Sequence, residues 1–175
     1  MKTFTVALAA ALFACAAQVH AADILATTSK PAVDKDDLAF VEKASQAGMF
    51  EVRSSELAIK RGVGSAEQAF AKQMIEDHTK ANAQLAALAG KKGIVIASDL
   101  DKKHQEMLDS LGTATDKEFA KDYVAAQLKG HKQAVDLFSD ESKEGKDVDL
   151  RAFAAETLPT LEAHLEHVKK VADKE

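Results

Sequence analysis

Four side chains in this sequence that can bind a metal have one property in common: each falls where a helical pattern requires an inward-facing residue. They are Glu51, His78, His131 and His164. Counting in steps of three and four residues, the spacing of one helical face, puts each of them on a stripe of apolar and small side chains. Three imidazoles and one carboxylate are ligands suited to Zn, Cu or Fe. The pattern therefore predicts a metal site inside a helical protein.

The same counting predicts that the four side chains lie at similar depth. At the helical rise per residue, Glu51 lies roughly 18 Å and His78 roughly 22 Å from the turn near Val63. His131 lies about 22 Å down the next long helix if that helix begins at the same end. His164 falls a turn or two nearer to that end, in a helix that contains Pro159. We therefore expect one layer of ligands midway along a bundle.

A purely structural network of the same residues is the alternative. An unpaired carboxylate in a core costs on the order of several kcal/mol, so Glu51 needs a partner there. That partner is either a metal ion or a protonated histidine in a hydrogen-bonded network that fixes the register of the helices. A di-iron or di-manganese centre is disfavoured, because such bundles use Glu-x-x-His motifs and the sequence contains none. His104 also lies on an apolar stripe, but on the short crossover helix, where partial burial is expected. His167 lies three residues after His164 and could share its face, but we interpret it as a boundary or surface residue.

Helix start and stop signals define the elements that must position these residues. Four long helices are expected at about 37–61, 65–89, 116–144 and 149–173. Capping boxes at Ser65–Gln68 and Thr115–Glu118 begin two of them, and glycines follow three of them. The roughly twenty residues between the second and third long helices carry a short helix, capped by Ser98 or Asp99. Two hairpins joined by one such crossover predict an all-α, ferritin-like four-helix bundle over residues 38–173.

Composition excludes some classes of partner. The chain of 175 residues has a net charge of -5 and only 5% aromatic residues. Its lysines and arginines are scattered among acidic residues, which argues against nucleic-acid binding. After the N-terminus no apolar run is long enough to cross a membrane.

The N-terminus is expected to direct export. Lys2 precedes the apolar run 4–14, and Val19-His20-Ala21 provides a cleavage site, so we interpret residues 1–21 as a signal peptide. Residues 22–37 are then a flexible lead, and the protein is periplasmic. Leu12-Phe13-Ala14-Cys15 is similar to a lipoprotein cleavage box, so a lipid anchor through Cys15 is the alternative.

Three segments also resemble a bacterial family of exported proteins, the domain-of-unknown-function family numbered forty-one forty-two, whose members are sometimes labelled outer-membrane proteins. They are residues 40–58 (FVEKASQAGMFEVRSSELA), 69–93 (AFAKQMIEDHTKANAQLAALAGKKG) and 153–165 (FAAETLPTLEAHL). The resemblance covers about residues 38–172 and implies a ferritin-like bundle. It implies no activity. The recurrent features of the family fall here on Glu51, Asp77-His78, Tyr123, His131 and Leu158-Pro159 with His164.

Three functional hypotheses follow from the sequence. The first is an exported bundle that binds one transition-metal ion for storage, sensing or redox protection. The second is a non-enzymatic envelope or stress-related protein whose buried Glu and His residues are structural and whose surface meets protein partners. The third is an oxidoreductase that acts on small oxidants, which requires the same metal with an open coordination position.

Overall fold

The structure is a computed structural model that describes residues 33–173. Within this range the chain forms helices and connections without a strand, as the composition predicts. The helices are α1 (Lys35–Arg61), α2 (Ser65–Lys92), α3 (Lys102–Thr113), α4 (Asp116–Glu144) and α5 (Val148–Ala172). The predicted signal peptide, Cys15 and residues 22–32 of the predicted lead lie outside the described residues.

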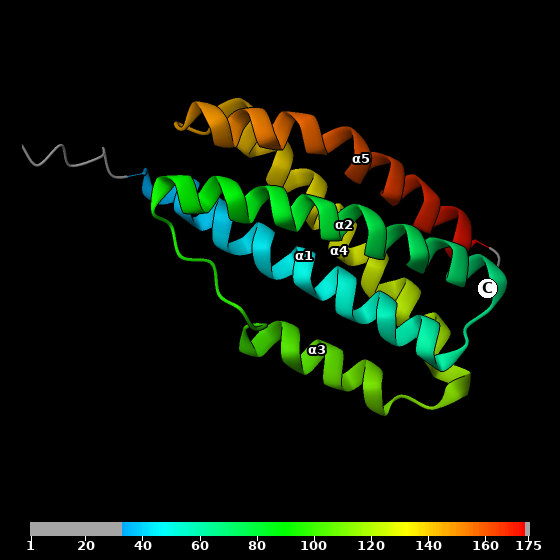
Figure 1. Ribbon diagram of the computed structural model, residues 1–175. Helices are drawn as coiled ribbons and strands as arrows, with labels where there is room; N and C mark the ends of the chain where they lie inside the picture. Colours follow the sequence, from blue (N-terminus) through cyan, green and yellow to red (C-terminus); the bar gives the residue numbers. More distant parts are fainter. Residues whose placement is uncertain (1–32, 174–175) are drawn as a thin grey trace, which may run out of the picture. The chain divides into compact units, whose positions relative to one another are not determined.

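Two helical hairpins make up the bundle. Helices α1 and α2 pack along each other, as do α4 and α5, and α3 lies beside α1 in the connection between the hairpins (Figure 1). The start of α1, the end of α2 and the α4–α5 connection meet at one end of the bundle. The end of α1, the end of α3 and the start of α4 meet at the other. The predicted pair of hairpins with a helix-bearing crossover is therefore present.

Several predicted helix boundaries differ in detail from the structure. Helix α1 begins at Lys35, before Asp37, and α2 continues past Gly90 to Lys92 with Gly93 as its C-cap. Gly64, not Ser65, is the N-cap of α2, and no side chain caps that helix; the Gln68 amide instead donates to the Val63 carbonyl at 2.8 Å.

Helix α3 begins later than predicted, because Asp101 is its cap and accepts a hydrogen bond from the backbone N–H of His104 at 2.8 Å. Helix α4 occupies its predicted range with Thr115 as its N-cap, but the predicted capping box is not formed, because the Thr115 hydroxyl donates to the Glu118 carboxylate at 2.8 Å and no side chain caps the helix.

Side chains of α1 fix both ends of the crossover. The Gln46 amide donates to the Asp99 carbonyl at 3.2 Å and accepts from the backbone N–H of Asp101 at 2.7 Å. The Asp99 backbone is thereby bound to α1 before the helix begins, which explains the later cap. At the other end, Arg61 donates to the Ala114 carbonyl at 2.8 Å and pairs with Asp116 at 2.7 Å.

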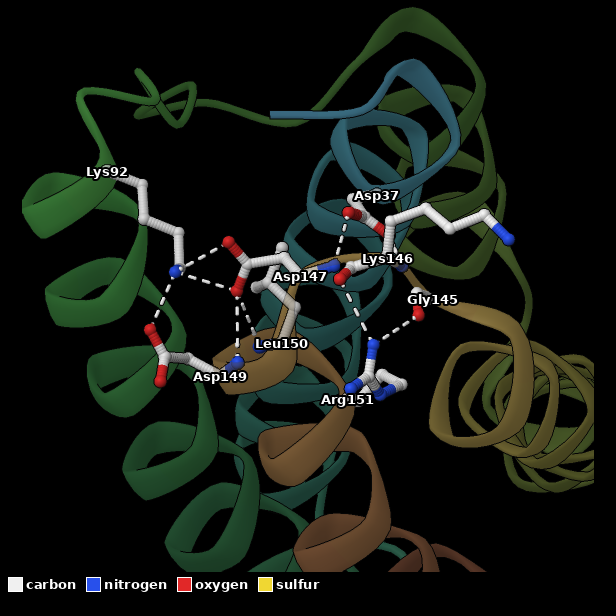
Figure 2. Close-up of polar contacts among 8 residues, drawn as sticks. All are labelled: Asp37, Lys92, Gly145, Lys146, Asp147, Asp149, Leu150 and Arg151. Carbon is white, nitrogen blue, oxygen red and sulfur yellow. Dashed lines mark hydrogen bonds and ion pairs between the residues drawn. The ribbon is translucent and has the colours of Figure 1, made fainter. Parts of the chain in front are cut away.

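Polar contacts also tie the opposite end of the bundle together (Figure 2). The buried Asp37 carboxylate of α1 accepts hydrogen bonds from the backbone N–H groups of Lys146 and Asp147, each at 2.8 Å. The Lys92 ammonium at the end of α2 contacts the Asp147 and Asp149 carboxylates at 2.7 Å. These contacts join three helix ends that are far apart in the sequence.

The apolar core is divided into two clusters along the bundle. One contains Phe70, Met74, Tyr123, Val124 and Val168, and the other contains Val41, Leu85, Phe138, Phe153 and Leu161. On α2, α4 and α5 the predicted histidine falls between a member of one cluster and a member of the other. The bundle therefore has a polar layer between two apolar ones. None of the described helices combines the length and the apolarity needed to cross a membrane.

Candidate metal centre

Three histidines from three helices meet in the polar layer. His78 comes from α2, His131 from α4 and His164 from α5, and their exposed fractions are 7%, 0% and 1%. Each offers one ring nitrogen, and the three nitrogens lie within 4.8 Å of one another. The Nε2 atoms of His78 and His131 are 3.4 Å apart. The inward stripes of the helices place these rings together.

A backbone carbonyl fixes the orientation of His131. Its Nδ1 lies 2.9 Å from the Gln127 carbonyl oxygen, one turn earlier in α4. A carbonyl oxygen can only accept, so Nδ1 carries the proton. The other nitrogen, Nε2, is then unprotonated and points towards His78. This is the tautomer that a metal-binding histidine requires, with its second nitrogen held by a neighbour.

A carboxylate fixes the orientation of His164 in the opposite sense. The Nε2 atom of His164 lies 2.8 Å from Oδ2 of Asp77 in α2. Its Nδ1 atom is buried and has no hydrogen-bond partner among the described residues. Since Nε2 donates to the carboxylate, Nδ1 carries the lone pair. A histidine bonded to a carboxylate on one side and free on the other is a common arrangement for a metal ligand.

Burial keeps all three rings neutral at pH 7. Desolvation lowers the pKa of His131 to about 4 and the pKa of His78 well below its usual value, and repulsion from neighbouring histidines lowers both further. The pKa of His164 is also lowered by burial, although the Asp77 carboxylate opposes this. Neutral imidazoles are the form that binds metal ions, and no proton must be removed first.

Glu51 lies beside this group without being part of it. It is 4% exposed, and its Oε1 lies 3.9 Å from Nδ1 of His131, the ring nitrogen that faces away from His78. Gly130 makes room for it, because a Cβ atom at that position would lie 2.7 Å from Oε1. Burial raises the pKa of Glu51 to about 8. Its role as a fourth ligand stays a prediction.

A chain of buried hydrogen bonds continues from this site along the bundle, and the sequence did not predict it. The Gln127 amide donates to Ser54 Oγ at 3.0 Å. Ser55 Oγ lies 2.8 Å from the Tyr123 hydroxyl. These two hydrogen bonds link α1 to α4 in the helical turns next to Glu51 and His131, and they hold the two helices in register.

The remaining described histidines have other partners. His104 of α3 pairs with Asp101 at 2.9 Å, and His167 Nδ1 lies 2.9 Å from the Gln73 amide oxygen. Asp77 is the residue of the site whose role sequence counting missed. It lies next to His78, on a face that turns towards α5. In the sequence, Asp77 can be recognised only as a carboxylate next to an inward-facing histidine. Its partner His164 becomes evident once α5 is known to lie beside α2.

Fold and site together define a class: a helical bundle with three histidines meeting in its core. The chain belongs to the family described as Domain of unknown function (DUF4142), whose model matches residues 22–171. No curated protein matches the chain.

Two solved structures are similar to it. The crystal structure of a DUF305 fragment from Deinococcus radiodurans has a TM-score of 0.71 and 13% identity, and the match covers 83% of this chain and 100% of that one. CopM in the Cu(II)-bound form has a TM-score of 0.62 and 15% identity, covering 79% of this chain and 96% of that one. At these identities the similarity shows a shared helical fold.

Proposed function

We propose that this protein binds one transition-metal ion in the core of the bundle, with His78, His131 and His164 as ligands. The observation that carries the proposal is the convergence of three neutral ring nitrogens. Two of them are turned inward by hydrogen bonds on the opposite side of the ring, from Gln127 and Asp77. Without an ion, the Nδ1 atom of His164 is a buried polar atom that lacks a partner among the described residues. Such atoms destabilise a fold unless a ligand satisfies them.

Copper is the first metal to test. Borderline imidazole ligands suit copper, zinc and iron, and copper(II) and zinc bind most tightly to such ligands among the common divalent ions. The structural neighbour CopM was solved with Cu(II), which directs attention to copper here without identifying the ion. Zinc and iron remain the alternatives that the ligand types allow.

We further propose that Glu51 supplies negative charge to the site. In the observed geometry it acts through His131, since its carboxylate lies near Nδ1 of that ring. Metal binding at Nε2 makes the ring more positive, and a neighbouring carboxylate stabilises that charge. Direct ligation requires the Glu51 side chain to turn from Nδ1 towards the centre of the three rings.

Metal content tests the proposal. Protein purified without a histidine tag and reloaded with copper or zinc should carry one ion per chain by elemental analysis. His78→Ala and His131→Ala should each reduce that content strongly, because each removes one of three ligands. His104→Ala is the matched control, since His104 pairs with Asp101 on α3, and it should retain the ion.

The proposal is wrong if the reloaded wild-type protein binds no transition metal, or if the three variants bind it equally well. Melting temperatures separate the two readings of the buried histidines. Replacing a metal ligand should abolish the rise in melting temperature that the added ion gives. Replacing a structural histidine should lower the melting temperature equally with and without the ion.

One observation favours a second candidate, a non-enzymatic envelope or stress-related protein with a structural polar core. In the metal-free protein burial raises the pKa of the Glu51 carboxyl to about 8, so under this second candidate the group stays protonated at pH 7 and needs no cation. The hydrogen bonds from Gln127 to Ser54 and between Ser55 and Tyr123 fix helix register without any ligand. Protein partners at the surface would then carry the function.

We also propose that the bundle is of the ferritin-like type and that the protein is periplasmic. The two hairpins with a helix-bearing crossover support the first proposal. The signal-peptide pattern of residues 1–21 supports the second, with a lipid anchor through Cys15 as the alternative. Mass spectrometry of the protein isolated from its native host identifies the N-terminal residue. It thereby distinguishes cleavage after Ala21 from a lipid-modified Cys15.

A further inference from the structure

A cavity adjoins the three histidines and extends beyond them. Its volume is about 30 Å³, and residues of α1, α2, α4 and α5 line it. About 10–15 Å³ of such space is enough for one water molecule. The cavity therefore accepts two or three water-sized groups. One of these positions is that of the ion, which leaves the space of one or two water molecules, about the size of a diatomic molecule or a short linear triatomic ion.

Small residues keep this space open. Ala44 of α1, Ala81 of α2 and Ala134 of α4 line the cavity, so three of the four helices present only a methyl group to it at these points. Phe138, Phe153 and Leu161 form its apolar wall on the side away from the histidines. Such walls exclude bulk water and large polar molecules.

Thr160 of α5 is the exposed residue among those that line the cavity, and we infer from it an entrance between α5 and α2. Asp77 and Ala81 of α2 and Thr157 of α5 line the cavity and are half-buried. The other lining residues on α1 and α4 are buried or half-buried. The Thr157 hydroxyl donates to the Phe153 carbonyl at 2.7 Å, so Thr160 is the threonine of this lining whose hydroxyl can contact a small molecule that enters from solvent.

Three histidine ligands leave at least one coordination position of a metal ion to an external ligand. We propose that the ion at this site carries one external ligand of two or three non-hydrogen atoms, a small anion or a diatomic molecule, which enters between α2 and α5 and occupies the cavity. This inference rests on the proposed function. It names the class of molecule that the site selects, and selection is by size, because the small-residue walls set the volume.

Azide and imidazole test the size limit in the copper(II)-loaded protein. Both bind copper(II), but azide has three atoms in line whereas imidazole has a five-membered ring. Azide should change the absorption and electron paramagnetic resonance spectra of the bound copper, and imidazole at the same concentration should not. Equal binding of the two probes, or no spectral change with azide, would overturn the inference.

Filling the cavity is the second arm of the test. Ala81→Leu should retain one copper ion per chain and bind azide at least tenfold more weakly, because the added side chain narrows the entrance. Ala83→Leu is the matched control on the same helix, since Ala83 is exposed, and it should bind azide like the wild type. Ala134→Leu narrows the cavity from α4 and replaces Ala81→Leu if that variant loses copper.

The outcomes separate the two proposals. Failure of the wild-type protein to bind any of copper, zinc and iron rejects the metal site, and the inference with it. Copper uptake with unchanged spectra in azide rejects only the external ligand. If both cavity-filling variants bind azide with the affinity of the wild type, the external ligand neither enters between α2 and α5 nor occupies this cavity.

Discussion

At the scale of single residues, the site depends on groups that hold the histidines as much as on the histidines themselves. His164 presents Nδ1 to the centre because Asp77 holds its Nε2. His131 presents the opposite nitrogen because the Gln127 carbonyl holds its Nδ1. In the proposed site the two rings therefore present different nitrogens to the ion, and each assignment follows from one hydrogen bond. Asp77 is a positioning residue in this arrangement.

Replacing Asp77 tests this role. Asp77→Asn keeps the shape of the side chain and removes its charge, so it weakens the hold on the His164 tautomer. We expect metal affinity to fall about 10- to 100-fold, the usual effect of losing a carboxylate that supports a histidine ligand. Affinity is measured by competition with a chelator of known strength.

Glu76→Gln is the control, because it removes a negative charge from the neighbouring, exposed position on α2. It should leave the affinity nearly unchanged. Equal losses in the two variants would mean that only long-range charge matters and that the contact between Asp77 and His164 does not.

At the scale of elements, the bundle is closed at one end by charges that join three helix ends. Lys92 lies at the end of α2 and its side chain is 9% exposed, yet it contacts two carboxylates at the start of α5. The pKa of Lys92 is raised by these hydrogen bonds and charges against the opposing effect of burial. The contacts matter for the site because they fix how α2 lies beside α5, the pair of helices that forms the entrance.

Lys92→Met should therefore destabilise the protein. We expect a loss of about 1–2 kcal/mol in the free energy of unfolding, because the contact with the half-buried Asp147 is largely removed from water whereas that with Asp149, which is 61% exposed, contributes little. Lys169→Met is the control, because its partner Glu166 lies on the same helix and both side chains are well exposed. A loss within about 0.5 kcal/mol is expected there. Equal shifts in urea denaturation curves would contradict the structural importance of the Lys92 contacts.

At the scale of the whole molecule, helical periodicity was enough to predict the four long helices and their inward faces. Val41, Leu85, Val124 and Leu161 lie on predicted stripes and are buried. The spacing placed His78, His131 and His164 on those stripes because a helix turns by a constant angle per residue, and their ring nitrogens lie within 4.8 Å of one another in the structure. The fold class and the histidine cluster were within reach of the sequence.

Contacts between particular helices could not be predicted from the sequence. Periodicity indicates which face of a helix is buried, but it does not indicate which helix packs against that face. The pairing of Asp77 with His164 depends on α5 lying beside α2. The Gln46 contacts that delay the start of α3 depend on where the crossover runs. The place of Glu51 beside Nδ1 of His131 depends on the close approach of Gly130. Each of these features is a property of two elements at once.

Buried carboxyl groups give the whole molecule a pH dependence that can be measured without metal. Burial raises the pKa of Glu51 to about 8. Burial also raises the pKa of Glu141 to about 7, with contributions from the Asp37 and Asp147 carboxylates and opposition from Arg151. In the unfolded chain both groups titrate near 4.5. The folded state therefore binds more protons, and stability falls as pH rises.

The contribution of Glu51 is complete below pH 4.5 and is lost as pH rises through about 8. From about pH 7.5 to about 8 the buried histidines are largely neutral in both states, because their pKa is 6.5 in the unfolded chain and lower in the folded protein. In this window the metal-free wild type should lose about 1.4 kcal/mol per pH unit for each carboxyl that holds an extra proton when folded. Denaturant unfolding of metal-free Glu51→Gln should show a shallower slope, since glutamine does not titrate. The exposed Glu162→Gln should keep the wild-type slope. If the free energy of unfolding of Glu51→Gln falls with pH as steeply as that of the wild type, Glu51 is already charged in the folded protein. The buried carboxylate would then need a cation beside it at neutral pH.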